Sequence, residues 1–301
     1  MLLVVAESSG SSPGRAGYKM AVGGDGKLFG SIGGGVMEVN LVEQSRRVLR
    51  DLALRRPPVK LKEQVHRKGS LNSSGMLCSG RQIIIFKLLG SDDLAAVNHA
   101  ADALGNLRPD ILSISQDRLT VASTAPEHDL LFEKHSETDF LFTEKLGAKN
   151  DLYIIGGGHC ALALSELMSK MDFRIRIFDD RPDLNTIEKN EFADEIMIID
   201  RYEQIGEHIA PGSNVYVVVM TLGYASDAVV IRRLIGHDLK YFGVLGSRAK
   251  MATLLKELRS EGISPDRLDN IRTPIGIPIN SHTPEEIAVS IAAEMIAVKN
   301  A

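Results

Sequence analysis

The second half of the chain alternates short apolar segments with amphipathic segments of helical length. Strands are predicted there over residues 152–155, 174–178, 195–199, 214–220 and 241–245, and helices over about 160–171, 202–209, 226–236 and 248–262. Strands that alternate with helices of this length are joined by right-handed crossovers into a parallel sheet. This regularity predicts an α/β fold of the Rossmann-like, doubly wound type.

The first half mixes strands and helices in a less regular order. Its strands are predicted over residues 2–7, 18–22, 27–31 and 82–89 and as a pair near 111–123, and its helices over 36–49 and about 92–104. A polar stretch, residues 124–150, separates the two halves, and 301 residues exceed what one compact core usually serves. We therefore predict a mixed α/β domain over residues 1–148 and the Rossmann-like domain over 149–301.

Composition limits the function classes. A net charge of -4 and a pI near 6.1 describe an ordinary surface and give no reason to expect a nucleic acid or a membrane as a partner. The two cysteines are far apart and match no zinc spacing, which favours a reducing compartment. The opening MLLVVAESSG is expected to be a strand rather than a signal peptide, so we expect a cytoplasmic protein.

A glycine triplet in the second half has the context of a nucleotide-binding loop. Gly156, Gly157 and Gly158 follow a predicted strand, precede a predicted helix, and form a G-x-G-x-x-A pattern with Ala161. The pattern predicts that a phosphate-bearing ligand binds here, and the alternative is a turn that serves packing alone. His159, at the start of the helix, is expected to donate a hydrogen bond to a ligand rather than to bind a metal.

Two further segments of the second half follow predicted strands. Asp179 and Asp180 could accept hydrogen bonds from a ribose hydroxyl, although Arg181 is adjacent and an exposed acidic turn is the alternative. Gly246 and Ser247 precede a helix whose first turn carries cations. Cations at a helix N-terminus oppose its dipole, which suggests that an anion binds there, and a solvated basic turn is the alternative. The cations are Arg248 and Lys250.

The first half contains a second glycine triplet and a cysteine in a glycine-rich segment. Gly33, Gly34 and Gly35 are predicted to form a nest of backbone N–H groups, in which Glu38 suits a ligand hydroxyl or amine or simply complements the helix dipole. Cys78 could be a thiolate or a soft metal ligand, or a small buried hydrophobe. No familiar motif supplies a catalytic acid, base or nucleophile.

Several motifs together resemble those of the XdhC/CoxI family of xanthine dehydrogenase accessory proteins, and the resemblance runs over nearly the whole chain in the family's order. The resemblance implies a cytoplasmic, dimeric protein with an N-terminal α/β domain and a Rossmann-like domain. Such proteins bind the molybdenum cofactor, assist its sulfuration and pass it to a molybdenum hydroxylase. The motifs that carry the resemblance are GSIGGGVMEVNL, GMLCSG, IIGGGHCALALSEL, FDDRP and YFGVLGSRAK.

The resemblance assigns cofactor contacts residue by residue. The family's segments fall on Gly34, Gly35 and Glu38, with Gly33 ahead, on Cys78 to Gly80, on Gly156 to His159, on Asp179 to Pro182, and on Gly246 to Arg248 with Lys250. The segment TLGYASD begins at Thr221, a further expected contact, but Leu222 and Tyr224 stand where many relatives have Arg and His. Val36 replaces a frequent cysteine, and Ser79 replaces a glycine.

These observations favour an accessory protein, not an enzyme, that holds the cofactor phosphate on the second triplet. Cys78 and Glu38 would then approach the pterin or metal end, with Cys78 as a candidate molybdenum contact. The expected partners are a xanthine dehydrogenase-like hydroxylase and a sulfur donor, and the expected assembly is a homodimer. One rival is an NAD(P)-dependent oxidoreductase that uses the same Rossmann motif. A third reading is a scaffold with a vestigial nucleotide site.

Overall fold

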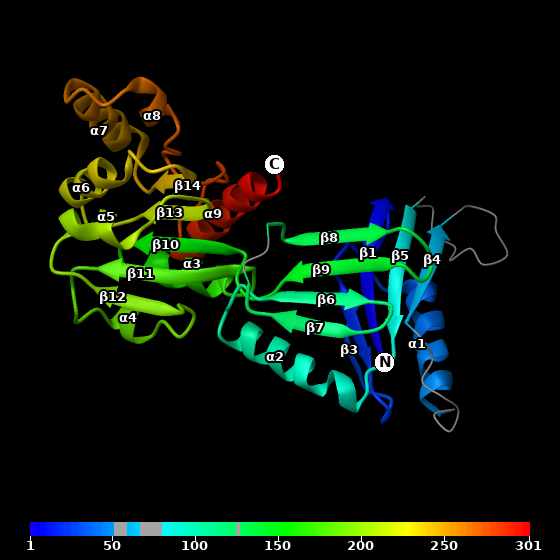
Figure 1. Cartoon of the computed structure of the whole chain (residues 1–301). Coiled ribbons are helices and arrows are strands. Elements are labelled where there is room, and N and C mark those ends of the chain that lie inside the picture. Colours follow the sequence, from blue (N-terminus) through cyan, green and yellow to red (C-terminus); the bar gives the residue numbers. More distant parts are fainter. Residues whose placement is uncertain (51–58, 67–79, 125–126) are drawn as a thin grey trace. The chain divides into compact units, whose positions relative to one another are not determined.

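The computed structural model describes residues 1–50, 59–66, 80–124 and 127–301. The chain separates into two compact units, Met1–Gly147 and Ala148–Ala301 (Figure 1). Each unit has buried apolar clusters of its own, so each is described separately.

The first unit contains an antiparallel sheet with the strand order β3-β2-β1-β5-β4. Leu3 and Val5 of β1 face helix α1 together with Ile84 of β5, and α1 contributes Leu41 and Val42 to this cluster. The alternation of side chains along β1 sends its other residues to the opposite face of the sheet. The elements are β1 (Leu2–Gly10), β2 (Lys19–Val22), β3 (Leu28–Gly30), α1 (Gly35–Arg50), β4 (Lys60–His66) and β5 (Gly80–Lys87).

A second antiparallel sheet of the first unit has the order β7-β6-β9-β8 and packs against that opposite face. Residues 124–150 carry no predicted strand, yet β8 and β9 form there. Phe140 and Phe142 are buried and alternate with more exposed neighbours, so the strand period is present within a polar composition. The elements are η1 (Ser91–Asp93), α2 (Leu94–Gly105), β6 (Ile111–Ser115), β7 (Leu119–Ala122), β8 (Leu130–Lys134) and β9 (Phe140–Lys145).

The second unit is built on a parallel sheet with the order β12-β11-β10-β13-β14, which confirms the predicted Rossmann-like fold. The strand order reverses between β10 and β13. In sheets of this type, ligands bind beyond the carboxyl ends of the strands at that reversal. The strands are β10 (Asn150–Ile155), β11 (Phe173–Asp179), β12 (Glu195–Ile198), β13 (Gly212–Val219) and β14 (Leu239–Val244).

Helices cover both faces of the parallel sheet. Helices α3 (His159–Met168) and α9 (Pro284–Lys299) pack together on one face, and α5, α6 and α7 pack on the other (Figure 1). No helix of the described residues is long and apolar enough to cross a membrane. The remaining elements are α4 (Asn185–Glu188), η2 (Tyr202–Gln204), α5 (Ile205–His208), α6 (Tyr224–Leu234), α7 (Arg248–Ser260) and α8 (Pro265–Asp269).

Candidate functional site

The candidate residues of the second unit meet at the carboxyl edge of the parallel sheet. Hydrogen bonds of 2.8 Å from the Met220 N–H to the Ile155 carbonyl and from the Leu245 N–H to the Val219 carbonyl keep these strand ends in line. The predicted ligand contacts come directly after β10, β11, β13 and β14, so the fold brings them to one edge. They are Gly156 to His159, Asp179 to Arg181, Thr221, and Gly246 to Arg248.

Gly156 lets the loop after β10 lie directly against the end of β13. Its φ of +110° lies in the region that favours glycine, and a Cβ there would stand 2.2 Å from the Met220 carbonyl oxygen. No other residue fits this turn without movement of the backbone. The first glycine of the triplet therefore sets the close approach of the two strands at the point of reversal.

Gly158 presents the start of α3 to an open space, whereas a Cβ on Gly157 would stand 2.7 Å from Ile187 Cγ1. The Gly157 N–H donates to Asp179 Oδ2 at 2.6 Å, and Thr186 Oγ1 donates to the Gly157 carbonyl at 2.5 Å. Gly158 is the N-cap of α3, and a Cβ on it would meet no atom within 4 Å in the described part of the chain. Free N–H groups and the positive end of the helix dipole favour an anion at such a place, and His159 is exposed beside it.

Asp179 is fully buried and fastens the loop rather than facing a ligand. Its carboxylate accepts from the Gly157 N–H and, at 2.8 to 2.9 Å, from the backbone N–H, Nε and Nη2 of Arg181. Burial by itself raises the pKa of Asp179, but the bonds from Arg181 and Gly157 outweigh it and the pKa lies below its ordinary value. The role of accepting from a ligand hydroxyl therefore fits Asp180, which is exposed, better than Asp179.

The loop after β13 places a second buried carboxylate at the same edge. Asp227, in the first turn of α6, accepts from Thr221 Oγ1 at 2.6 Å and from the Thr221 N–H at 3.3 Å. Burial raises the pKa of Asp227 despite these bonds and the nearby Lys250. Asp227 was not among the predicted site residues, although it closes the segment TLGYASD. A buried acid beside a candidate ligand site is a functional candidate in its own right.

Leu222 and Tyr224 are the two residues of that segment at which the family resemblance led us to expect Arg and His. The Leu222 side chain is 80% exposed. The Tyr224 hydroxyl donates to Glu257 Oε2 of α7, and this bond raises the pKa of Tyr224 to about 12. Tyr224 therefore ties α6 to α7, and Leu222 presents an apolar side chain to solvent at the edge of the site.

The start of α7 adds cations to the edge. Ser247 is the N-cap of this helix, and its side chain accepts from the Lys250 N–H at 3.4 Å. A Cβ on Gly246 would lie 2.6 Å from Met251 Cε, so the turn is closely packed. Arg248 and Lys250 are exposed and form no ion pair with any described residue. Their charges are available to an anion.

The first triplet forms a nest whose occupant is the chain itself. Gly33, Gly34 and Gly35 have φ values of +125°, +75° and +72°. Glu38 Oε2 accepts from the Ile32 N–H at 2.8 Å, from the Gly34 N–H at 3.0 Å and from a serine hydroxyl. Partial burial opposes these bonds, yet they hold the pKa of Glu38 below its ordinary value. A carboxylate in this place leaves no cradle for a phosphate.

The neighbourhood of the first triplet is tightly built. A Cβ on Gly33 would stand 2.4 Å from the Gly14 backbone nitrogen, and buried Gln82 donates to the Gly14 carbonyl at 3.0 Å. Arg81 pairs with Glu7 at 2.9 Å and Glu63 at 2.6 Å.

Cys78, the candidate molybdenum contact, and Ser79 lie outside the described residues. Among residues that are described, no group of three or more His, Cys, Asp or Glu could hold a metal ion.

Comparison with known proteins places both units in one family. A family model described as the XdhC Rossmann domain matches residues 152–295, and one described as the XdhC and CoxI family matches residues 1–56. An uncharacterized protein of Escherichia coli (strain K12), YqeB, is 23% identical over 296 residues, which are 98% of this chain and 43% of that protein. A probable xanthine dehydrogenase subunit of Bacillus subtilis (strain 168) is 29% identical over 161 residues, which are 53% of this chain and 46% of that protein.

The chain thus spans less than half the length of these curated relatives. A solved structure has the same fold over nearly the whole chain. The crystal structure of a xanthine dehydrogenase from Bacillus halodurans matches 99% of this chain and 91% of that chain, with a TM-score of 0.74 and 23% sequence identity. The motifs, the fold and both family models agree, and the chain belongs to the XdhC and CoxI family.

Proposed function

We propose that the protein is an accessory protein that binds the molybdenum cofactor and delivers it to a molybdenum hydroxylase of the xanthine dehydrogenase type. The observation that carries this proposal is the open space before Gly158 at the N-terminus of α3, at the reversal of the strand order. The Bacillus subtilis relative, described as a probable xanthine dehydrogenase component, supports the choice of partner.

The residues at this edge fit the phosphate end of the cofactor. The first N–H groups of α3 have no partner within the helix, and they follow Gly158, whose Cβ position is open. Arg248 and Lys250 supply positive charge without a competing ion pair in the described residues. The backbone N–H groups of α3 and the two cations thus favour a phosphate ester over a neutral ligand.

The proposal also assigns contacts to the pterin and metal end of the cofactor, which the protein would carry to the hydroxylase. Cys78, Glu38 and the first triplet are proposed to approach it. The Glu38 Oε2 atom is held in the nest, so the carboxylate is fixed in position and can accept a ligand donor with its other oxygen. We further propose that the cofactor is sulfurated with the help of a separate sulfur donor. The protein is proposed to act as a homodimer in the cytoplasm.

Activation of an apo-hydroxylase tests the proposal. We expect wild-type protein with bound cofactor to restore activity to a cofactor-free xanthine dehydrogenase-type enzyme. Gly158→Trp fills the open space without backbone strain and is expected to abolish restoration. Gly105→Trp is the matched control, since Gly105 also faces open space but lies at the end of α2 in the other unit.

Three outcomes would contradict the proposal. The first is full activity with Gly158→Trp, which would move the phosphate elsewhere. The second is a wild-type protein that neither binds the cofactor nor activates the enzyme. The third is tight NAD binding with hydride transfer to a carbonyl substrate, which would make the protein an oxidoreductase of the Rossmann type.

A further inference from the structure

A cavity lies at the other end of β14 from the glycine loops. Its volume is about 430 Å³, and it borders the N-terminal half of the strand and the segment that follows α8. Gly246 and Ser247 follow the opposite, C-terminal end of the same strand. The cavity is therefore separate from the proposed cofactor site. Its volume falls within the range of about 300–1,000 Å³ that small-molecule pockets occupy.

The cavity exists because the outer edge of β14 is covered only in part. β14 is the edge strand of its sheet, and on its outer side the Arg272 N–H donates to the Phe242 carbonyl at 2.8 Å. The Val244 N–H donates to the Arg272 carbonyl at 3.0 Å. Toward Leu239, no described strand pairs with this edge, so the chain leaves a hollow beside it.

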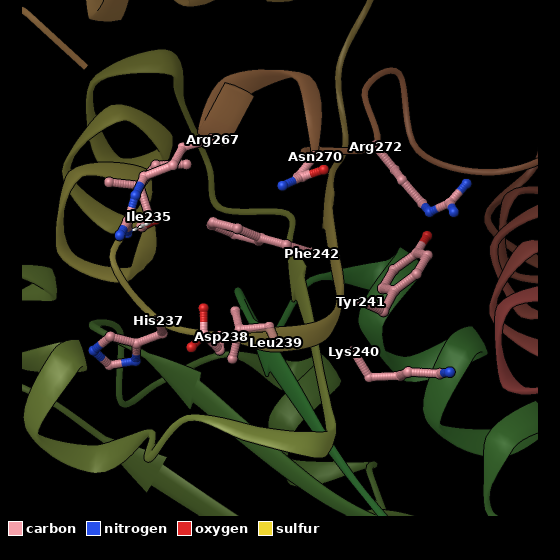
Figure 2. Close-up of a pocket in the computed structure, with 10 residues that line it drawn as sticks. All are labelled: Ile235, His237, Asp238, Leu239, Lys240, Tyr241, Phe242, Arg267, Asn270 and Arg272. Atoms are coloured by element: carbon pink, nitrogen blue, oxygen red, sulfur yellow. Dashed lines mark hydrogen bonds between the residues drawn. The ribbon is translucent and has the colours of Figure 1, made fainter. Parts of the chain in front are cut away.

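The residues that line the cavity include aromatic rings and several polar side chains, among them a carboxylate, an amide and a guanidinium. Figure 2 shows Phe242, Asp238 and Asn270 facing the middle of the cavity, with Arg267 at one side. A carboxylate accepts hydrogen bonds, an amide both donates and accepts, and a guanidinium donates. Such a set, beside an aromatic ring, suits the edge and the face of a planar heterocycle.

Arg267 keeps its positive charge available. Its Nη1 donates to the Ile235 carbonyl at 2.9 Å, which fixes the side chain at the end of α6. That partner is neutral, and Arg267 forms no ion pair with another residue of the described chain. Arg272, next to Tyr241 in Figure 2, by contrast pairs with Glu294, with 3.5 Å between Arg272 Nη1 and Glu294 Oε1. A fixed guanidinium with free donors is well suited to an oxyanion.

We propose that this cavity is a second small-molecule site, which binds a planar heterocycle carrying an oxyanion, the size and chemistry of a nucleoside monophosphate. Phe242 packs against the ring, Asp238 and Asn270 bind its edge, and Arg267 binds the oxyanion. The proposal does not depend on the function proposed above, because the two sites share no residue.

Calorimetric titration with AMP tests the proposal, and the Gly158→Trp variant of the 301-residue chain is used so that the glycine loop is blocked. We expect one AMP to bind per chain. Adenosine lacks the oxyanion and inorganic phosphate lacks the ring, so each is expected to bind at least about tenfold more weakly. Asn270→Leu and Asp238→Ala are each expected to weaken AMP binding about tenfold, a change of about 1.4 kcal/mol. Lys256→Ala, an exposed cation on α7, is the control and should bind as its parent does.

Asn270 and Asp238 are exposed, so both variants are expected to fold, and their melting temperatures verify this. The proposal is overturned if AMP binds wild type but not Gly158→Trp, because the glycine loop would then be the AMP site. It is also overturned if neither cavity variant weakens binding, or if inorganic phosphate binds as tightly as AMP. Delivery of the cofactor to a hydroxylase is measured separately in the activation assay, so failure of this proposal can be told apart from failure of the proposed function.

Discussion

The same three-glycine sequence serves two different purposes in the two units. In the first unit all three glycines have positive φ and wrap around the Glu38 carboxylate. In the second triplet only Gly156 has a positive φ, and Gly158 caps a helix that begins at an open space. The first triplet therefore binds a carboxylate of the chain itself, whereas the second triplet leaves the start of its helix open.

The difference comes from the residues that follow each triplet. Glu38 lies in the first turn of α1, from which its side chain reaches back to the Ile32 and Gly34 N–H groups as a capping side chain would. The first turn of α3 contains no acid. A glycine motif therefore predicts free N–H groups, while the next helical turn decides whether the chain or a ligand binds them.

The largest expected effect distinguishes glycines within the second triplet. Gly156→Ala places a Cβ 2.2 Å from the Met220 carbonyl in a conformation with φ of +110°. We expect a loss of about 2–4 kcal/mol in the free energy of unfolding, measured with urea. Gly158→Ala meets no atom within 4 Å in the described chain and should change stability by less than about 0.5 kcal/mol. Equal losses for the two variants would refute the assigned roles.

Asp179→Asn tests how the open loop is held. The substitution removes the buried negative charge that Arg181 binds. We expect the free energy of unfolding to fall by about 2 kcal/mol at neutral pH. The folded-state pKa is lowered, so the wild-type advantage exists above the unfolded-state pKa and is lost as pH falls through the folded-state value. The difference in the free energy of unfolding between wild type and Asp179→Asn should therefore become smaller below about pH 4. A gap that stays constant with pH would show that the charge is not responsible.

Glu38→Ala should convert the closed triplet into an open one. The variant loses the carboxylate that accepts from the Ile32 and Gly34 N–H groups, and we expect its free energy of unfolding to fall by about 1 kcal/mol. The emptied nest is then expected to bind an anion. Added phosphate should raise the melting temperature of Glu38→Ala more than that of wild type. An identical phosphate response in both proteins would mean that the nest is not an anion site.

The smallest expected effect concerns Asp227. Its folded-state pKa is raised, so the folded state binds protons more readily than the unfolded state and stability rises as pH falls through this window. Asp227→Asn removes a buried charge but keeps an oxygen for Thr221. At pH 7 we expect no loss of stability, or a gain of up to about 1 kcal/mol, and no difference below about pH 4. Destabilisation at pH 7 like that of Asp179→Asn would contradict the contrast between the two aspartates.

The fold of the second unit could be predicted because its strands are buried apolar runs separated by helical periods. The first unit was harder, since β8 and β9 lie in a stretch of mostly polar composition in which few apolar residues, such as Phe140 and Phe142, are buried. Short elements such as α4 and α8 have too few residues to show a period. Sequence patterns therefore describe elements that bury one continuous face, and they miss elements that contribute only one or two core side chains.

The location of the candidate site was predictable, whereas the partners of its side chains were not. Residues that follow parallel strands must meet at one edge, which brings Gly158 and Ser247 to the same region. The sequence does not reveal that the Asp179 carboxylate accepts hydrogen bonds from Arg181, or that the Glu38 carboxylate binds the N–H groups of the first triplet's nest. These contacts depend on burial and on side-chain reach, which only the folded chain determines.

Anaerobic equilibrium binding of the molybdenum cofactor tests most directly whether the second triplet is the phosphate cradle. Wild type and Gly158→Trp are compared, with Gly105→Trp as control. We predict saturable binding to wild type and the control, and loss of binding in Gly158→Trp at an unchanged melting temperature. Binding to Gly158→Trp with wild-type affinity would contradict the account.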